Sequence, residues 1–534
     1  MRLFLRLSAA FIVLAGFFGS AHAQGIQAVE PASGRVVLVL PFENRSGNTT
    51  LNWIGDSFPD TINRRLNTAG FLTISRDDRV FAYDHLGLPV DFRPSRATSI
   101  RIAQQLDADY IIIGSFNLSG TRINAQAQVL SVDDLRLSAP VQDSADLQKL
   151  FDAENAIAWK VARVIDPHFN VSESTFLGAP GAVPLPAFED YIRGDNAPTP
   201  QERLQRLKEA VNYAPDYASA LLALGKEQYA EHDFAGAAAT LGKVPTSSPL
   251  ALEANFYLGL ARFNSTNYAG AEQAFAFVAQ HLPLPEVVNN EAVAQSRQGK
   301  DAVALFQRAS AADPSDEDYH YNLAISLFRQ GDTAAALREA DAALKLKPND
   351  NEALQLQAHL RAVPPGTHLS PDTAAGFSPV ERIRRTYSET SYRQAAFQLE
   401  QMRTARLATL SPAQRAAEYC AIGRDELQQG LVPEAETRFQ SALAADPNSA
   451  EAHAGMAEVR EKTGNEAEAR SEAMASLRLH PNAPALLVLA RLDLGKNALP
   501  VAAAEVSQAL QLDPSNAIAQ SLKLVLQTRG QTVR

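Results

Sequence analysis

Prolines recur at nearly constant intervals through much of the chain, and this period limits the possible folds more than any other feature. The steps between them are 34, 34, 31 and 34 residues in a first run and 34 and 33 residues in a second. The prolines are Pro215, Pro249, Pro283, Pro314, Pro348, Pro447, Pro481 and Pro514. A period of about 20–50 residues indicates structural units that stack in a row. A chain of 534 residues is also too long for one core, so we expect a repeat array joined to another domain.

Small residues recur at fixed places within these units. In three units a glycine is followed twelve residues later by an alanine, and the pairs are Gly225 and Ala237, Gly259 and Ala271, and Gly423 and Ala435. Because small side chains let two helices approach closely, each unit is predicted to be a helical hairpin in which the glycine faces the alanine. Other glycines are predicted in the turns between the helices, where a left-handed conformation favours glycine; they are Gly331, Gly430 and Gly464.

The 34-residue period, with small and aromatic residues at these offsets, resembles the tetratricopeptide repeat. We assign a first block of repeats to residues 187–361, and a second block with a C-terminal capping helix to residues 380–534. Residues 362–379 are rich in proline and glycine and are predicted to form a loop between the blocks. A single hairpin cannot offset its ordering entropy, so the resemblance implies an all-α solenoid that is stabilised by stacking.

An α/β pattern precedes the repeats at residues 36–170, between short linkers at 24–35 and 171–186. The run from Val36 to Leu40 is apolar throughout, as expected for a strand that is covered on both faces. Apolar residues then recur at every fourth position, which predicts a helix; they are Ile54, Phe58, Ile62 and Leu66. The other predicted elements are strands at 71–74, 107–116 and 123–129, and helices near 102–106 and 145–165.

Four stretches of this region look like the TolB amino-terminal-like domain: VLPFEN at 39–44, INRRL at 62–66, ADYIIIGSF at 108–116 and INAQAQVL at 123–130. The resemblance implies a mixed sheet with helices packed on it and no catalysis of its own. Domains of this family often precede tetratricopeptide repeats, in the order found here. The stretch SVDDLRLSAPVQ at 131–142 lacks the glycine and tryptophan that are usual in the family's next strand. We therefore expect a shortened or frayed edge strand after residue 130.

Residues 1–23 have the pattern of a cleavable signal peptide. Arg2 and Arg6 precede an apolar stretch from Leu7 to Gly19, and Ala21-His22-Ala23 forms an A-x-A cleavage site. Residue 24 is Gln rather than Cys, which disfavours a lipoprotein. We expect a periplasmic protein with no transmembrane segment after signal cleavage.

The sequence holds none of the motifs that mark nucleotide, metal or covalent chemistry. A net charge of −11 argues against a nucleic-acid partner, because such binding depends on Lys and Arg. The loop after VLVL at 37–40 contains Gly47 and Gly55 but lacks the lysine of the Walker pattern, so we interpret it as a corner of the fold. Neither H-E-x-x-H nor G-x-S-x-G occurs. We predict no catalytic residues, no cofactor and no metal, and a buried structural role for the single cysteine, Cys420.

The resemblance places the first helix of each repeat on the concave face of the solenoid. Aromatic residues at positions facing this groove are the candidates for contact with a protein or peptide partner; they are Tyr229, Phe256, Phe263, Tyr321 and Phe328. Aromatic side chains in a groove can carry much of a binding energy. The same positions hold aromatics that pack internally in other repeats, so both interpretations stay open.

These observations favour a non-enzymatic, exported adaptor or scaffold that mediates protein–protein interactions in the cell envelope. One alternative is a structural subunit of an outer-membrane or export assembly. Another is an envelope enzyme, for example one that acts on glycans, with an unrecognised site. A deep pocket lined by His, Asp or Glu would favour the enzyme, whereas a smooth groove would favour the adaptor.

Overall fold

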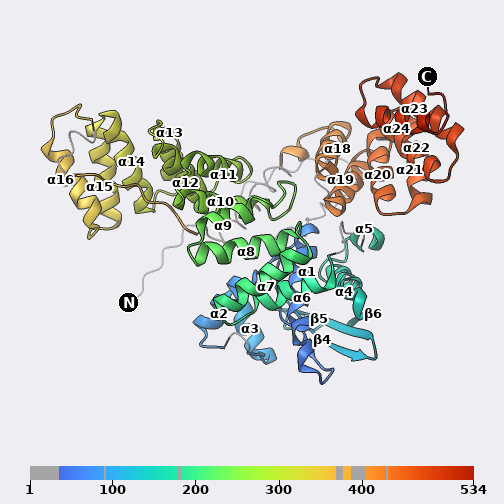
Figure 1. Ribbon diagram of the computed structural model, residues 1–534, viewed down its shortest axis with the longest axis horizontal. Helices are drawn as coiled ribbons and strands as arrows, with labels where there is room; N and C mark the ends of the chain where they lie inside the picture. Colours follow the sequence, from blue (N-terminus) through green and yellow to red (C-terminus); the bar gives the residue numbers. More distant parts are fainter. Residues whose placement is uncertain are drawn as a thin grey trace, which may run out of the picture.

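The computed structural model describes residues 35–89, 92–177, 183–368, 377–386, 405–428 and 431–533. The predicted signal peptide lies outside these ranges. An α/β domain comes first and a long series of helical hairpins follows, so the predicted fold class is confirmed. Figure 1 shows the sheet and its helices at the bottom, with the hairpins up to α16 extending to the left and those from α18 onward to the right.

The sheet is mixed and has the strand order β3-β1-β4-β5-β6, with β2 paired to β4. β1 pairs in parallel with β3 and β4, whereas β4, β5 and β6 are antiparallel. The strands are β1 (Val36–Val39), β2 (Glu43–Asn44), β3 (Leu72–Thr73), β4 (Tyr110–Ser119), β5 (Arg122–Ser131) and β6 (Val141–Asp146). The domain's main helices are α1 (Asn52–Thr68), α2 (Arg76–His85), α3 (Arg96–Gln105) and α4 (Leu150–Ile165).

Helices cover both faces of the sheet, which explains the continuous apolar run at its start. Val37 and Val39 belong to one core cluster together with residues of α1 and α4. Leu38 and Leu40 belong to a second cluster together with residues of α2 and α3. Successive side chains of a strand point to opposite faces, so a strand with helices on both sides needs apolar residues at every position.

The corner after β1 is held by close packing around Phe42. The Phe42 amide donates a hydrogen bond to the Gly55 carbonyl at 2.9 Å, and the side chain is fully buried. A Cβ on Gly114 would lie 2.3 Å from the Phe42 ring, and one on Gly55 would lie 2.3 Å from the Phe42 carbonyl oxygen. The loop therefore closes the fold at this point, as its sequence indicated.

The edge strand expected after residue 130 is present, and with 6 residues it is shorter than the 10-residue strand β5 beside it. Residues 141–146 form β6, which pairs with residues 122–127 of β5. The helix expected from residue 145 begins instead at Leu150. The sequence VQDSAD of β6 is polar and partly exposed on both faces, so it carries no alternation of apolar residues from which a strand could be predicted.

The rest of the chain is helical. The helices that lead into and form the first block are α5 (Glu173–Leu177), α6 (Leu185–Asp195), α7 (Pro200–Tyr213), α8 (Ala218–Ala230), α9 (Phe234–Leu241), α10 (Ala251–Asn264), α11 (Tyr268–His281), α12 (Pro285–Ser296), α13 (Val303–Ala312), α14 (Glu317–Gln330), α15 (Thr333–Leu346) and α16 (Asn351–Ala362). The second block contains α18 (Pro412–Gln428), α19 (Val432–Ala445), α20 (Ala450–Lys462), α21 (Glu466–Leu479), α22 (Ala483–Gly495), α23 (Leu499–Leu512) and α24 (Ala517–Thr528).

The glycines that recur in the repeats pack against a different residue from the one predicted. A Cβ on Gly259 would lie 2.6 Å from the ring of Phe275, and one on Gly423 would lie 3.0 Å from the ring of Phe439. The glycines thus make room for a large side chain of the second helix, rather than for the alanine one turn earlier. Gly331 and Gly464 adopt the expected left-handed conformation, with φ of 85° and 76°. The predicted turn at Gly430 lies outside the described residues.

The α/β domain and the first hairpin share one hydrophobic core. The core cluster that contains α1 and α4 continues through Phe188 and Ile192 of α6 to Leu207 of α7 and Leu224 of α8. The Tyr191 hydroxyl of α6 also hydrogen-bonds Asp60 of α1 at 2.8 Å. This continuity fixes the start of the solenoid on the domain.

Candidate functional site

The five aromatic residues predicted to face a groove do not form one exposed surface. Phe256, Tyr321 and Phe328 are each about 1% exposed, whereas Tyr229 and Phe263 are partly buried. Phe256 packs inside a core cluster, with its ring centroid 6.0 Å from that of Phe275. Of the two interpretations left open by the sequence, internal packing holds for Phe256 and Phe328, which are core residues and do not face a groove.

Tyr321 lies beneath another segment of the same chain. The guanidinium of Arg382 lies 4.0 Å from the centroid of the Tyr321 ring. Arg382 belongs to residues 377–386, hereafter the inner segment, which contains no helix or strand. The inner segment contacts α12 and α14, so residues 380–386 lie on the first block, although the sequence assigned them to the second. Phe377 and Ile383 pack against the first block's core cluster.

Asparagine side chains of the first block hold the backbone of the inner segment. The Arg382 amide donates to Asn322 Oδ1 at 2.7 Å, and Asn322 Nδ2 donates to the Arg382 carbonyl at 2.8 Å. Asn290 makes the same pair of bonds to Arg384, both at 2.7 Å. Asn289 Nδ2 adds a bond to the Arg382 carbonyl at 3.1 Å. Residues two apart are bonded from the same side, as in an extended strand.

A basic pocket receives the side chain of Glu381, which has no exposed surface. Glu381 Oε1 accepts hydrogen bonds from Ser296 Oγ, at 2.5 Å, and from the Arg329 guanidinium. Glu381 Oε2 lies 3.4 Å from Arg297 Nε. A buried carboxylate is tolerated when it is paired and hydrogen-bonded, and this pocket provides both.

An acidic pocket lies beside the basic one and receives Arg382. Its Nη1 lies 2.7 Å from Asp318 Oδ1 and 2.7 Å from Asp350 Oδ2, and its Nη2 lies 2.7 Å from Glu352 Oε2. The hydrogen bonds from Arg382 lower the pKa of Asp350 to about 2. Burial raises the pKa of Tyr321, beneath the guanidinium, to about 12.

Arg384 extends this acidic pocket toward the start of α14. Its guanidinium pairs with Asp316, and its Nη1 lies 3.2 Å from Asp318 Oδ2. It also lies 5.4 Å from the centroid of the Tyr319 ring. Two arginines of the inner segment are thus paired with four carboxylates of the first block, which are Asp316, Asp318, Asp350 and Glu352.

Asparagines rather than aromatics make the main contacts of this site. Their regular spacing in the sequence could have indicated them. Asn290 lies nine residues before Gly299, and Asn322 lies nine residues before Gly331. Both glycines occupy the turn of their hairpin with positive φ. A buried amide that recurs at one repeat position is not needed for packing between helices, so its recurrence indicates a polar ligand.

A second segment outside the repeats contacts the second block. Arg460 of α20 forms a 2.7 Å ion pair with the buried Glu436 of α19. The same guanidinium donates to Thr175 Oγ1 at 3.0 Å and to Ser172 Oγ at 3.1 Å. Ser172 and Thr175 lie at α5, just after the α/β domain, so these bonds join the domain to the second block.

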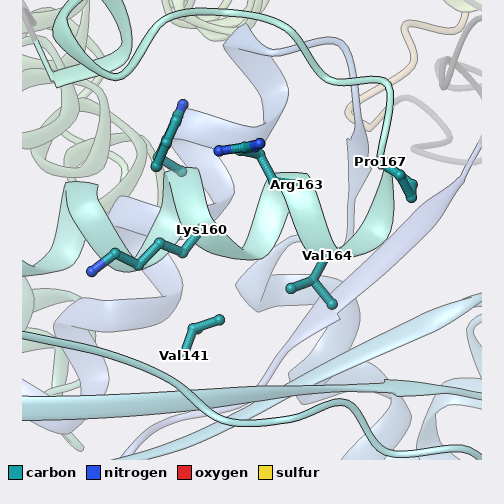
Figure 2. Close-up of a pocket in the computed structure, with 6 residues that line it drawn as sticks. Val141, Lys160, Arg163, Val164 and Pro167 are labelled. Atoms are coloured by element: carbon teal, nitrogen blue, oxygen red, sulfur yellow. The ribbon is translucent and has the colours of Figure 1, made fainter.

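A hollow beside the α/β domain is lined mainly by apolar and cationic side chains. It measures about 340 Å³ and is lined by Val141, Trp159, Lys160, Arg163, Val164 and Pro167. Figure 2 shows Lys160, Arg163 and Val164 extending from one helix above Val141. Lys160 Nζ is 2.5 Å from Asp143 Oδ2, and the Arg163 guanidinium lies 4.9 Å from the Trp159 ring. The lining contains no carboxylate or histidine, and its one lysine, Lys160, is held in the ion pair with Asp143.

Neither a metal-binding cluster nor a membrane-spanning helix occurs among the described residues. No cluster of three His, Cys, Asp or Glu side chains in the described ranges could hold a metal ion. None of the helices described combines the length and apolar character needed to cross a bilayer. Cys420, as its sequence context indicated, is buried and makes no disulfide.

The tetratricopeptide repeat family matches residues 222–278, 291–351 and 420–484, and these segments are tetratricopeptide repeats. No curated protein matches the chain. The LpoB C-terminal domain from Salmonella enterica is 22% identical over 22% of this chain and 88% of its own, with a TM-score of 0.19. MamA from Desulfovibrio magneticus RS-1 is 19% identical, over 32% of this chain and 99% of its own (TM-score 0.29). A tetratricopeptide repeat protein from Parabacteroides merdae is 12% identical, over 57% and 97% (TM-score 0.25).

Proposed function

We propose that this chain is an exported, non-enzymatic adaptor of the cell envelope, which binds a protein or peptide partner on the first helices of its first block. Tetratricopeptide repeat proteins mediate protein–protein interactions, and residues 222–278, 291–351 and 420–484 of this chain are such repeats. One observation carries the proposal: Asn290 and Asn322 each bond both the amide and the carbonyl of one residue in an extended segment. Side chains arranged in this way are a receptor for peptide backbone.

Export to the periplasm is part of the proposal and is supported by residues 1–23. Their charged start, apolar centre and A-x-A site are the features of a cleavable signal peptide. The mature protein is expected to begin at Gln24 and to appear in the periplasmic fraction. Mass spectrometry of the purified protein checks the cleavage, and a cytoplasmic protein that retains Met1 would contradict it.

Photo-crosslinking in intact cells tests the adaptor function. A crosslinking amino acid replaces Tyr229, which is partly buried on the first helix α8, and in a matched control it replaces Val501, which is 51% exposed on α23. We expect the Tyr229 position to capture a defined protein that the Val501 position does not. Equal capture at both positions, or capture at neither, would contradict a partner site on the first block.

A further inference from the structure

We propose that the inner segment is an internal ligand of the first block, and that its site also accepts, in trans, an extended peptide with the charge pattern acidic, basic, apolar, basic. In the inner segment this pattern is Glu381, Arg382, Ile383 and Arg384. The proposal deepens the proposed function, on which it rests, by naming the chemistry of the partner. A partner of this kind competes with the chain's own segment for the site.

The backbone contacts are suited to a ligand that can be exchanged. Within the inner segment, Asn290 and Asn322 bond only the amide and carbonyl groups of Arg384 and Arg382, which every residue other than proline presents. These bonds therefore fix the direction and register of an extended chain but do not select for its side chains. Any segment that follows the same path satisfies both asparagines.

The charged pockets provide the selectivity that the backbone contacts lack. The pocket for residue 381 contains two cations, Arg297 and Arg329, and accepts a carboxylate. The adjoining pocket for residues 382 and 384 contains four carboxylates, with Asp318 shared between the two arginines. A peptide with these charges reversed would place like charges together in partly buried sites, which opposes binding.

The contact is mostly polar, which distinguishes it from the hairpin packing around it. Apolar burial in the inner segment comes mainly from Phe377, Pro379 and Ile383, whereas its other described contacts are hydrogen bonds, ion pairs and the stacking of its arginines on tyrosine rings. A ligand within the same chain has an effective concentration on the order of millimolar for a short tether. A peptide in trans must compete with this effective concentration. The inner segment therefore sets the peptide concentration or affinity that partner binding requires.

A labelled peptide with the sequence of residues 377–386, FSPVERIRRT, tests the proposal on the full chain. In a released variant, Glu381→Ala, Arg382→Ala and Arg384→Ala weaken the internal ligand and leave the pockets intact. Fluorescence anisotropy should show that the peptide binds the released variant at least tenfold more tightly than the unaltered chain. Equal affinity for the two chains, or no binding to a folded released variant, would overturn the proposal.

Two controls separate this site from unspecific binding of a basic peptide. Adding Asn290→Ala and Asn322→Ala to the released variant should weaken peptide binding at least tenfold, whereas Asn255→Ala, on α10, should leave it unchanged. A peptide in which Glu381 and Arg382 are exchanged should also bind at least tenfold more weakly. Equal binding of the exchanged peptide would overturn the proposed charge pattern.

The folding and the oligomeric state of the variants provide the remaining outcomes. If circular dichroism shows that the released variant does not fold, Arg382→Ala alone is used, with a smaller gain in peptide affinity expected. If neither variant folds, the inner segment is a structural part of the solenoid and the proposal is overturned. A dimer of the unaltered chain that dissociates in the released variant, seen by light scattering, would show that two copies exchange the segment and would overturn an intramolecular ligand.

This experiment can fail independently of the proposed function. Failure of the peptide to bind, together with a captured protein at Tyr229, would leave the adaptor function standing on another surface. Peptide binding without a captured protein in cells would support the internal ligand and contradict the adaptor.

Discussion

The two repeat blocks share one hairpin geometry but hold segments from outside the repeats by different means. In the first block, amide side chains on the first helices bond the backbone of the inner segment. In the second block, the buried pair of Glu436 and Arg460 bonds the hydroxyl side chains of Ser172 and Thr175. The first contact repeats along the solenoid with the repeat period, and the second occurs at one place.

The two blocks differ at one position of the repeat, at which the residue type varies from unit to unit. Asn290 and Asn322 each lie nine residues before the left-handed residue of their turn, and the equivalent positions before Gly464 and Asn497 are Gly455 and Val488. Gly455 makes room for Phe439, since a Cβ there would lie 2.2 Å from its ring. The same position thus serves packing in the second block and ligand contact in the first.

The largest expected effect tests the packing that both blocks share. Phe439 is fully buried between Gly423 and Gly455, so Phe439→Ala should lower the free energy of unfolding by about 3–5 kcal/mol. Denaturant titration measures the loss. Met474→Ala, at a 47% exposed residue of the same block, is the matched control and should cost less than about 0.5 kcal/mol. A loss below about 1 kcal/mol at Phe439 would contradict the register of the hairpins.

Much of the fold could be predicted because it depends on periodic patterns. The proline period and the glycine offsets located the hairpins, and the apolar run at Val36 located β1. The turn at Gly331 was predicted from the preference of glycine for a left-handed conformation. The edge strand β6 was expected only from the family resemblance, because a polar edge strand contains no such period.

The candidate site could be predicted only in part, for a physical reason. The aromatics Phe256 and Phe328 follow the repeat, but a pattern cannot show whether a ring at a helix position faces a neighbouring helix or a groove. The inner segment was assigned partly to the loop and partly to the second block, because residues 377–386 show no periodic pattern. Its position depends on contacts such as that between Asn322 and Arg382, which are 60 residues apart in the chain.

A pH experiment should distinguish Glu434 of the second block from Asp350 of the first, because only the contribution of Glu434 should change between pH 5 and 8. Burial raises the pKa of Glu434 in α19 to about 7, and no described residue hydrogen-bonds its buried Oε2. Because the folded pKa lies above the unfolded value of 4.5, this group's contribution is favourable below about pH 4.5 and is lost as the pH rises through 7. The loss between pH 5 and 8 should be at most about 3 kcal/mol.

The pKa of Asp350 in the first block is shifted the other way, to about 2. Its contribution is present above the unfolded value of 3.8 and is lost only as the pH falls toward 2, so it stays constant between pH 5 and 8. Urea titrations at pH 5 and 8 make the comparison. Glu434→Gln should flatten the dependence of the free energy of unfolding on pH between pH 5 and 8. An unchanged dependence in this variant would assign the loss of stability to another group.

The asparagine contact is expected to give an effect of intermediate size. Asn322→Ala removes both bonds to the backbone of Arg382 and should lower the protection of that amide by about 1–2 kcal/mol, or roughly 5- to 30-fold in exchange rate. Hydrogen exchange with mass spectrometry measures it. Asn255, whose Nδ2 donates to the Ala251 carbonyl of its own helix, is the matched control. An equal change in Asn255→Ala would indicate a general loss of helix stability.

The smallest expected effect concerns Tyr229, an aromatic residue that was predicted to line the groove. Its ring contacts Phe234 and Tyr257, with centroid distances of 5.4 and 6.1 Å, and its hydroxyl accepts a single 3.3 Å hydrogen bond from Asn264. Tyr229→Phe keeps the ring contacts and removes only this exposed bond, so unfolding should change by less than about 0.5 kcal/mol. Peptide affinity in the released variant should stay within about twofold, because the described bonds to the inner segment's backbone come from asparagines. Calorimetry and anisotropy measure the two quantities. A larger loss of affinity with unchanged stability would extend the ligand site from the asparagines to α8, and the contrast between the blocks would then include aromatic contacts.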